Sequence, residues 1–396
     1  MLSPRSLCCP LLAAALLVGG GVRAAVAAPG AAPDPPAKAA AARAKVAEAD
    51  ARAAAMLVCT RGRITELFVD NNSVFEIDPN KQGSRLTWAF RTANRLHVRT
   101  RERVIRRELL FREGDCYDAA LLQDSERILR AVPFIADADV FAIRQADGSY
   151  HVVVQTRDEW STRLEARVRG GELGGLELRE DNLFGTGQHL SAYGWQRRGR
   201  HVYGATYGTT QLLGTHVNAD LAVERTPVGI SAMESLSLPF RGETTGRWAV
   251  LQQLAQENDY FEYSARDVDG RRVQYLFPQR RRNVDVGTVA RLGRRGNLTL
   301  FGVGVSGEWV DYPPGVLVTG GPVDRPITPA DSGRLVGLDS ISDVRIVFLA
   351  GQRNLRFDRR RALDAVRGSE DVSLGGEVEL GVGRSLTAFS TDDDMT

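Results

Sequence analysis

The stretch Asp371–Leu386, "DVSLGGEVELGVGRSL", alternates apolar and polar residues along most of its length. In an extended chain, one side would carry the apolar residues Val372, Leu374, Val378, Leu380 and Val382. The other side would carry Ser373, Glu377, Glu379 and Ser385. Because successive side chains of a β-strand point to opposite faces, this pattern predicts a strand with one apolar and one polar face.

The same alternation runs through the chain from Trp160 onward, for example in "STRLEARVRG" (Ser161–Gly170) and "THVNADLAVE" (Thr215–Glu224). Segments of about ten residues suit strands that cross a bilayer at a tilt. The aromatic residues near segment ends are expected to form interface girdles: Tyr193, Trp195, Tyr203, Tyr207, Trp248, Tyr260, Phe261, Tyr263 and Trp309. These features favour an antiparallel membrane barrel with a polar lumen, although a soluble sandwich or jelly roll would also alternate.

The length of the alternating region predicts how many strands it holds. At roughly 20 to 24 residues per strand and connection, residues 159–396 supply about ten to twelve strands. A barrel with too few strands leaves open edges, which hydrocarbon does not tolerate. We therefore expect a barrel that is incomplete at its C-terminus, with a smaller closed barrel as the alternative.

Residues 62–158 have a different texture and predict an α+β domain of order β-α-α-β-β. "RITELFVD" (Arg63–Asp70) is expected to be a strand, and "TRERVIRRELL" a helix with Thr100 as its N-cap. A second helix is expected from Asp118 to the break at Pro133. Two strands, 135–144 and 150–157, then join through Asp147-Gly148, a hairpin signal.

The N-terminal residues 1–27 predict a secretory signal peptide, with Arg5, the apolar run Leu11–Val18 and a small-residue cleavage site at Ala25–Ala27. A lipoprotein signal at Cys8 and Cys9 is a less favoured alternative. Residues 28–61 predict an alanine- and proline-rich linker and a short helix.

Signal cleavage would leave Cys59 and Cys116 as the remaining cysteines. Export makes a disulfide between them possible, because secreted proteins meet an oxidising environment. Two unpaired buried thiols are the alternative.

The chain offers little for catalysis or cofactor binding. Its net charge of +2 gives no reason to expect a nucleic-acid partner. Lysine occurs only at Lys38, Lys45 and Lys81, so later segments lack the lysine of Walker-type phosphate loops and Schiff-base sites. No nucleophile elbow, zinc-protease motif or C-x-x-C pair is present in the sequence. We expect no enzyme activity, no cofactor and no metal.

The stretch "LREDNLFGTGQHL" (Leu178–Leu190) resembles a phosphate-binding glycine loop at first sight. A dinucleotide fingerprint needs a third glycine and a following helix, whereas position 190 is Leu190 and the next residues alternate like a strand. We therefore predict a structural turn at the barrel entry that shapes its first hairpin. Its key residues are Asp181, Asn182, Gly185 and Gly187.

Two segments resemble a known family. The run from Ile105 to Tyr117, "IRRELLFREGDCY", and "SERILR" (Ser125–Arg130) are similar to the POTRA domain, the polypeptide-transport-associated module. "TRDEW" (Thr156–Trp160) and "EDNLFGTGQHL" resemble the BamA/TamA outer-membrane superfamily, also called the bacterial surface antigen family. The resemblance covers roughly residues 62–396 and becomes diffuse after the first barrel hairpin.

The resemblance implies a periplasmic POTRA domain before an outer-membrane barrel that takes part in protein insertion or translocation. Its implied partners are outer-membrane lipid, unfolded client proteins and periplasmic accessory proteins. It suggests that client strands pair with the segment Ile135–Arg144, unless that strand is interior to its sheet. The candidate residues are Ile135, Asp137, Asp139, Phe141 and Ile143.

Two departures weaken the implied activity. The family's inward-folded loop with its arginine-glycine-aromatic motif has no clear match, and the chain lacks a terminal strand that ends in an aromatic residue. A passive pore without assembly activity is therefore a second hypothesis, and a soluble exported β-sandwich binding protein is a third.

Overall fold

A computed structural model describes residues 59–75, 87–169, 172–197, 200–267, 269–321, 323–329, 338–361 and 369–391. The predicted signal peptide and most of the predicted linker lie outside these residues. From Cys59 onward the chain forms one compact unit.

The first part of this unit, Arg63–Asp158, is called the α+β domain here. Its strands are β1 (Ile64–Asn72), β2 (Ile135–Arg144) and β3 (Tyr150–Asp158), and its helices are α2 (Thr87–Leu96), α3 (Glu102–Glu108) and α4 (Ala119–Arg130). The sheet order is β1-β3-β2, with β1 parallel and β2 antiparallel to β3. Helix α2 was not predicted from the sequence, which indicated only the two helices that correspond to α3 and α4.

Helices α3 and α4 supply apolar side chains to the core of this domain. Ile105 and Leu129 from the helices and Val152 and Val154 from the central strand β3 are fully buried. Helix α4 begins as predicted, because the Asp118 carboxylate accepts a hydrogen bond from the Ala120 N–H. Pro133 lies three residues beyond its end.

The predicted N-cap of the preceding helix is wrong. Helix α3 begins at Glu102 with Arg101 in the N-cap position and no side-chain cap. The Thr100 hydroxyl instead accepts a hydrogen bond from Asn182, 82 residues later in the chain. A contact from a distant segment has overridden the local capping preference of threonine.

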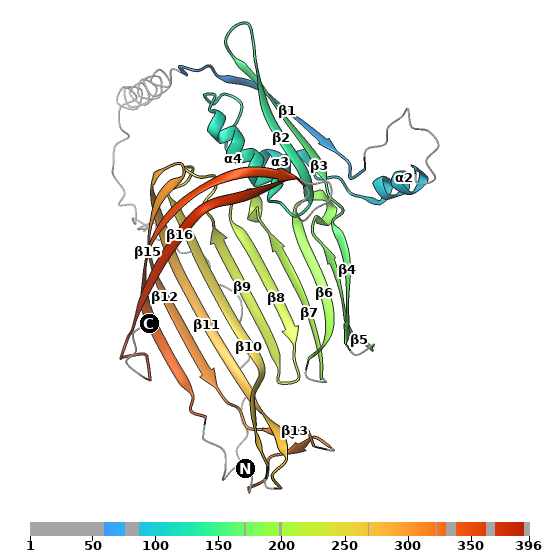
Figure 1. The fold of residues 1–396 in the computed structure, drawn as a ribbon, viewed down its shortest axis with the longest axis vertical. Helices are drawn as coiled ribbons and strands as arrows, with labels where there is room; N and C mark the ends of the chain where they lie inside the picture. The colour runs from blue at the N-terminus through green and yellow to red at the C-terminus, as the bar shows by residue number, and fades with distance from the viewer. Residues whose placement is uncertain are drawn as a thin grey trace, which may run out of the picture. The chain divides into compact units, whose positions relative to one another are not determined.

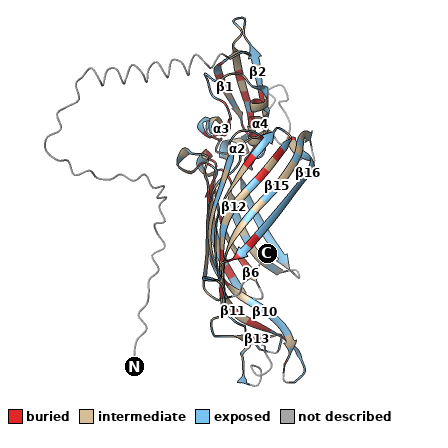
Figure 2. Ribbon diagram, turned by 90° about the vertical axis from the view of Figure 1, so that its left-hand side faces the viewer, coloured by how far each residue is buried: buried red, intermediate tan, exposed pale blue. Residues whose placement is uncertain are grey.

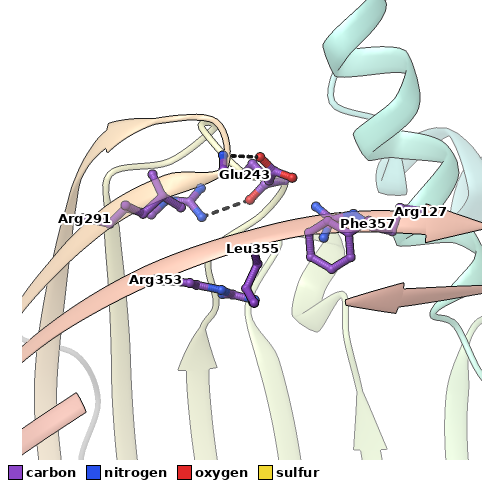
Figure 3. A pocket seen from close by; sticks show the side chains of 9 residues that line it. Arg127, Glu243, Arg291, Arg353, Leu355 and Phe357 are labelled. Atoms are coloured by element: carbon purple, nitrogen blue, oxygen red, sulfur yellow. Dashed lines mark hydrogen bonds between the residues drawn. The ribbon is translucent and has the colours of Figure 1, made fainter. Parts of the chain in front are cut away.

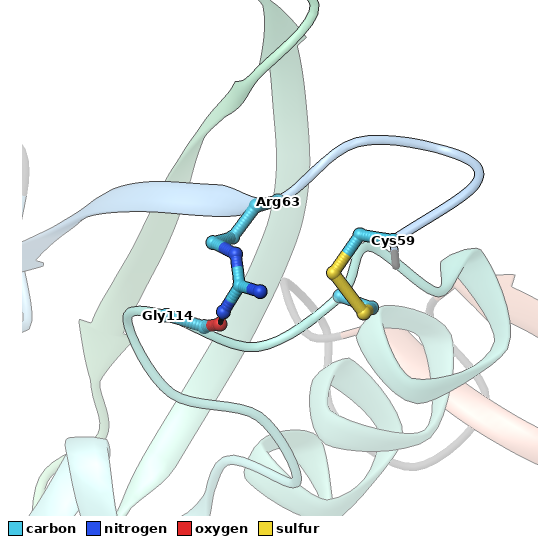
Figure 4. Close-up of a disulfide and its surroundings, with 4 residues drawn as sticks. Cys59, Arg63 and Gly114 are labelled. Carbon is cyan, nitrogen blue, oxygen red and sulfur yellow. Dashed lines mark hydrogen bonds between the residues drawn. A yellow bond between two sulfur atoms is a disulfide. The ribbon is translucent and has the colours of Figure 1, made fainter. Parts of the chain in front are cut away.

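Cys59 and Cys116 form a disulfide with a Cα–Cα distance of 5.1 Å (Figure 4). It ties the chain just before β1 to the loop before α4. The Arg63 guanidinium donates to the Gly114 carbonyl beside it. Pairing of the two cysteines, which the sequence left open, is therefore confirmed.

The rest of the unit is a large antiparallel sheet of the β-barrel class (Figure 1). Within the described residues its path contains eleven strands, which agrees with the predicted ten to twelve. The first six are β4 (Thr162–Arg169), β5 (Glu172–Glu180), β6 (Gln188–Arg197), β7 (Arg200–Thr209), β8 (Asn218–Arg225) and β9 (Ile230–Leu238). The other five are β10 (Trp248–Arg266), β11 (Arg272–Arg294), β12 (Asn297–Asp311), β15 (Ile341–Arg361) and β16 (Ser369–Ser385).

Each strand on this path pairs with its neighbour in chain order, and the path ends at β4 and at β16. Among the described pairings none joins these two end strands, so the alternative of a smaller closed barrel is not observed. The far ends of β10 and β11 extend beyond β9 and pair with each other. There β11 also pairs with the short strand β13 (Leu317–Thr319), which pairs with β14 (Arg325–Pro326). Val273, Tyr275 and Val318 form a small core in this extension.

Candidate functional site

One face of the large sheet is mostly apolar along the strand path, although it also carries polar residues such as Glu234 of β9 and Gln252 of β10. Residues that pair across antiparallel strands share a face, so each register gives a row of side chains. In the first half of the sheet one row is Leu164, Leu178, Ala192, Ala205, Val223 and Ala232. In the second half another is Leu238, Val250, Thr288, Val303, Phe348 and Val382. We call this surface the apolar face.

Many large side chains of the apolar face are open to solvent. Leu164 is 72% exposed at one end of the sheet, Val303 is 47% exposed in the middle and Leu380 is 64% exposed near the other end. Figure 2 colours β12, β15 and β16 largely as exposed or intermediate along their length. An apolar surface of this extent is not expected to face water, because soluble proteins rarely expose contiguous apolar patches larger than a few hundred Å².

The opposite surface, here called the polar face, carries charged, hydroxyl and small residues. One row crosses most of the sheet as His189, Gly208, Asp220, Ser235, Gln253, Asp285, Ser306, Arg345 and Ser385. Ion pairs link strands on it: Arg197 of β6 reaches across β7 to Glu224 of β8, and Arg281 of β11 pairs with Glu308 of the neighbouring β12. The alternation predicted from the sequence therefore resolves into two chemically distinct faces.

Only some of the aromatic residues predicted to form a girdle lie on the apolar face. Tyr203, Tyr207 and Trp248 lie on the apolar face by register. Tyr193 and Trp195 lie on the polar face, where their rings stack on each other and Arg167 lies over the Trp195 ring. These two residues fill space beside glycines: an added Cβ at Gly204 would lie 2.3 Å from Tyr193 Cζ.

The predicted entry turn forms the connection between β5 and β6, with Gly185 at φ +70° and Gly187 at φ +71°. The positive φ angles agree with the structural interpretation of this stretch. Its assignment to the first hairpin is wrong, because β4 and β5 pair before it. Asp181 and Asn182 are buried at the start of the turn.

This turn binds the start of helix α3. The Asn182 side chain donates to the Thr100 hydroxyl at 2.8 Å and accepts from the Gly187 N–H at 2.9 Å. The Arg101 N–H donates to the Gly185 carbonyl at 2.9 Å. Behind them, Asp158 Oδ2 accepts from the Thr100 N–H and lies 2.9 Å from His97 Nε2. Gly185 has to be glycine for space as well, since an added Cβ would lie 2.2 Å from the Arg99 carbonyl oxygen.

A second turn of the same shape, between β7 and β8, was missed by the sequence analysis. Leu213 has φ 50° and ψ 25°, and Phe184 in the first turn has φ 53° and ψ 25°. The sequences "NLFGT" (Asn182–Thr186) and "QLLGT" (Gln211–Thr215) are a repeat that could have revealed it. The left-handed conformation costs a residue with a side chain about 1–2 kcal/mol.

The second turn also binds helix α3. The Gln211 amide donates to the Val104 carbonyl at 3.0 Å and to Glu108 at 2.6 Å. His216 Nε2 lies 3.0 Å from the Arg107 carbonyl oxygen. Two equivalent turns of the large sheet therefore bind consecutive parts of one segment, first the residues just before helix α3 and then the helix itself.

The β9–β10 and β11–β12 turns, at the same end of the sheet, contact the end of α3 and helix α4. Between β9 and β10, Arg241 donates to the Glu108 carboxylate at 2.8 Å and to the Arg107 carbonyl at 3.1 Å, at the C-terminal end of α3. Burial lowers the pKa of Arg241, and Glu108 opposes this shift. Between β11 and β12, Arg295 pairs with Asp124 of α4 at 3.0 Å.

Arginines gather around a small pocket beside these turns (Figure 3). It is lined by Arg127 of α4, by Arg291 and Arg353 of the sheet, and by Glu243. Arg291 donates to the carbonyls of Gly242 and Gly246 at 2.9 Å each, and so holds the β9–β10 turn closed. The pocket belongs to this structural junction.

The predicted client-pairing strand, β2, lies at one edge of the three-stranded sheet. Its residues do not share one environment. Ile135 is buried in the core, whereas Phe141 and Ile143 are 41% and 49% exposed. Asp137 and Asp139 both accept from Arg359 of β15, at 3.0 and 2.6 Å.

Side chains of α4 form hydrogen bonds to backbone groups of β2. The Val140 N–H donates to Glu126 at 3.3 Å, and the Ala138 carbonyl accepts from Arg130 at 3.0 Å. Arg130 also forms a bidentate pair with Asp371 of β16, with both distances 2.8 Å. Burial alone would lower the pKa of Arg130, but its hydrogen bonds to Asp371 and Glu126 raise that pKa overall. The edge is thus covered at Ala138–Val140 by a charged network that reaches the last strand of the large sheet.

Other kinds of site are not found in the part of the chain that the structure describes. It contains no cluster of three or more histidine, cysteine, aspartate or glutamate side chains that could hold a metal ion. Within the same residues, none of the helices has the length and apolar character needed to cross a membrane.

Comparison with solved structures finds likenesses, of which two are described here. No family model matches the chain, and no curated protein matches it. BamA from Haemophilus ducreyi lacking POTRA domains 1-3 is similar with a TM-score of 0.31 and 8% identity, over 80% of this chain and 84% of that chain. FpvA from P. aeruginosa bound to heterologous pyoverdines is similar with a TM-score of 0.30 and 10% identity, over 63% of this chain and 41% of that chain. Likenesses at these TM-scores carry no argument about function, and this chain is placed in no family by them.

Proposed function

We propose that this chain is an outer-membrane β-barrel protein that takes part in inserting or translocating proteins, with its α+β domain in the periplasm. The observation that carries the membrane assignment is the division of the large sheet into an apolar face with exposed leucine, valine and phenylalanine and a polar face. Strands β4–β9 have 8 to 10 residues, close to the length of a tilted membrane-spanning strand.

A matched pair of arginine substitutions on β12 tests the membrane assignment. Val303→Arg places a charge on the apolar face, and Ser306→Arg places the same charge on the polar face three residues away. Val303→Arg should reduce the free energy of folding into lipid vesicles by about 2–4 kcal/mol, as charges on the lipid face of a barrel do near the midplane. Ser306→Arg should cost less than about 1 kcal/mol, because that side chain meets water.

The measurement is urea titration of the vesicle-inserted protein, read as the heat-modifiable band on gels. Equal effects of the two substitutions, or recovery of the folded protein without lipid, would favour a soluble sandwich.

The assembly role rests on the edge position of β2 and on the exposed residues Phe141 and Ile143 at its far end. A strand edge offers N–H and C=O groups to an extended client segment. Depletion of the protein should lower the amounts of other outer-membrane proteins, and Phe141→Asp with Ile143→Asp should reproduce that loss. Normal amounts of those proteins after depletion would contradict the assembly role.

A passive pore is the second candidate, and one observation favours it. The backbone of β2 is already covered by Glu126 and Arg130 at Ala138–Val140, which leaves a short stretch for pairing. A pore would show steady ion conductance after reconstitution, together with normal assembly of other outer-membrane proteins when it is depleted.

A further inference from the structure

The two equivalent turns expose apolar side chains in an unusual conformation. Phe184 is 67% exposed and Leu213 is 95% exposed, and both have positive φ angles. Asparagine or glycine would fit this backbone with less strain and would interact better with water. Both turns nevertheless carry a large apolar residue there, although the packing of the protein does not use it.

Two arginines of the α+β domain, Arg101 and Arg107, lie against the two turns, and Arg99 and Arg103 belong to the same segment. Arg99, Arg101, Arg103 and Arg107 are all exposed. Arg101 Nε donates to the Phe184 carbonyl at 3.1 Å, and an added Cβ at Gly214 would lie 2.9 Å from Arg107 Nη2. The carboxylates of the same segment, Glu102 and Glu108, are paired with Arg106 and Arg241. The segment 99–108 therefore carries an excess of positive charge beside the two turns, while Glu180 lies at the start of the first turn.

The turns also continue the apolar face of the sheet. Leu178 and Leu190, in the strands that lead into and out of the first turn, are 55% and 43% exposed. Leu221, three residues into the strand after the second turn, is 48% exposed. Apolar side chains beside a cluster of arginines are the chemistry that binds the boundary between the headgroups and acyl chains of an anionic lipid layer.

We propose that Phe184 and Leu213 insert into the surface of an anionic phospholipid leaflet, while Arg99, Arg101, Arg103 and Arg107 bind lipid phosphates. This surface would fix the depth of the sheet and the distance of the α+β domain from the bilayer. The inference rests on the proposed membrane location of the apolar face. It adds a lipid contact outside the spanning strands, made by the turns and by the domain.

Environment-sensitive labelling tests the contact in the full-length chain. Cys8 and Cys9 are replaced by serine, the Cys59–Cys116 disulfide is kept, and single cysteines are labelled with the fluorophore NBD. The labelled positions are Phe184→Cys, Leu213→Cys, the control Thr215→Cys in the same turn, and Val303→Cys on the apolar face. The protein is folded into vesicles of phosphatidylcholine with or without phosphatidylglycerol.

Labels at positions 184 and 213 should be about threefold brighter than the label at 215 and should emit at shorter wavelength, because they leave water. Spin-labelled lipids with the nitroxide near the headgroup should quench them more than lipids labelled deep in the chain. If both behave like the label at 215 while the label at 303 is protected, the lipid contact is wrong and the membrane sheet stands. If the label at 303 is also in water, both proposals fail.

Two double variants separate lipid binding from turn structure. Phe184→Asn with Leu213→Asn introduces residues that tolerate the left-handed backbone better, so the unfolding midpoint in detergent should not fall. Folding into anionic vesicles should slow by about fivefold or more, because two apolar anchors are lost. Equal slowing in detergent and in vesicles would show that the side chains serve only the turn.

The second variant, Arg99→Gln with Arg103→Gln, removes charge without touching the hydrogen bonds between the domain and the turns. It should reduce the preference for vesicles that contain phosphatidylglycerol by about fivefold for each arginine removed. An unchanged preference would contradict the role of the arginines.

Discussion

Gly185 shows how a single residue joins the α+β domain to the large sheet. Its positive φ favours glycine, and its close approach to the Arg99 carbonyl leaves no room for a Cβ. Gly296, in the β11–β12 turn, has a similar φ of +75°, but an added Cβ there would lie 3.4 Å from its nearest neighbour, the Leu355 carbonyl oxygen. Both glycines therefore have a positive φ angle, but only Gly185 lacks space for a Cβ.

We therefore expect Gly296→Ala to lower the free energy of unfolding by about 1 kcal/mol, the usual cost of an alanine at positive φ. Gly185→Ala should cost about 2 kcal/mol more, because the turn has to move away from helix α3 and lose the Arg101 hydrogen bond. Urea unfolding of both variants in the same detergent measures the difference. Equal losses would mean that the backbone conformation alone matters at Gly185.

At the same scale, sequence reasoning recognised the turn residues but not their partners. The glycine pair predicted a turn because glycine tolerates positive φ, and that property is local. The prediction of Thr100 as a helix cap is wrong because its partner, Asn182, is remote in sequence, and a single sequence holds no signal for such a contact. The repeat of the turn at Gln211–Thr215 was visible in the residues and was missed.

At the scale of elements, side chains of helix α4 form hydrogen bonds to backbone groups at the edge of strand β2. Glu126→Ala should let the Val140 amide exchange its hydrogen about tenfold faster, because that N–H loses its acceptor. Glu126→Gln is the matched control, since its side-chain oxygen can still accept the bond. Hydrogen exchange read at Val140 decides between them, and unchanged exchange in the alanine variant would show that the edge is protected by something else.

If β2 also pairs with client strands, the alanine variant should bind an extended peptide more tightly than the glutamine variant. Glu126 would then limit how readily the edge of β2 pairs with a client strand.

The sequence predicted these elements unevenly, for a physical reason. Period-two alternation identified the strands of the large sheet because one face is mostly apolar and the other polar, so the residue types alternate along each strand. Helix α2 was not predicted. The faces of Tyr193 and Trp195 depend on strand register, and composition near segment ends cannot supply register.

Across the whole molecule, Arg359 is the clearest link between the last strands and the α+β domain. It meets Glu126, Asp137 and Asp139, at 3.3, 3.0 and 2.6 Å. Arg359→Met would leave three carboxylates close together without their common cation, and should destabilise the folded protein by about 1–3 kcal/mol. The neighbouring Arg360, with 62% of its side chain exposed, is the control, and Arg360→Met should cost less than about 0.5 kcal/mol.

Unfolding at low and at high salt measures both variants. The loss in Arg359→Met should shrink in 1 M salt, because the remaining like charges are then screened. A loss that does not depend on salt would assign the effect to packing of the arginine stem.

The contacts between the turns and the α+β domain follow the order of the chain on both sides. The β5–β6 turn meets residues 100–101, the β7–β8 turn residues 104–108, the β11–β12 turn residues 120–124, and β15–β16 residues 126–139. The α+β domain is synthesised before the sheet, so it would act as a template on which successive hairpins dock one after another. Each arriving hairpin would find its neighbour and its docking position already in place, so the chain closes a short loop at each step rather than one very long loop.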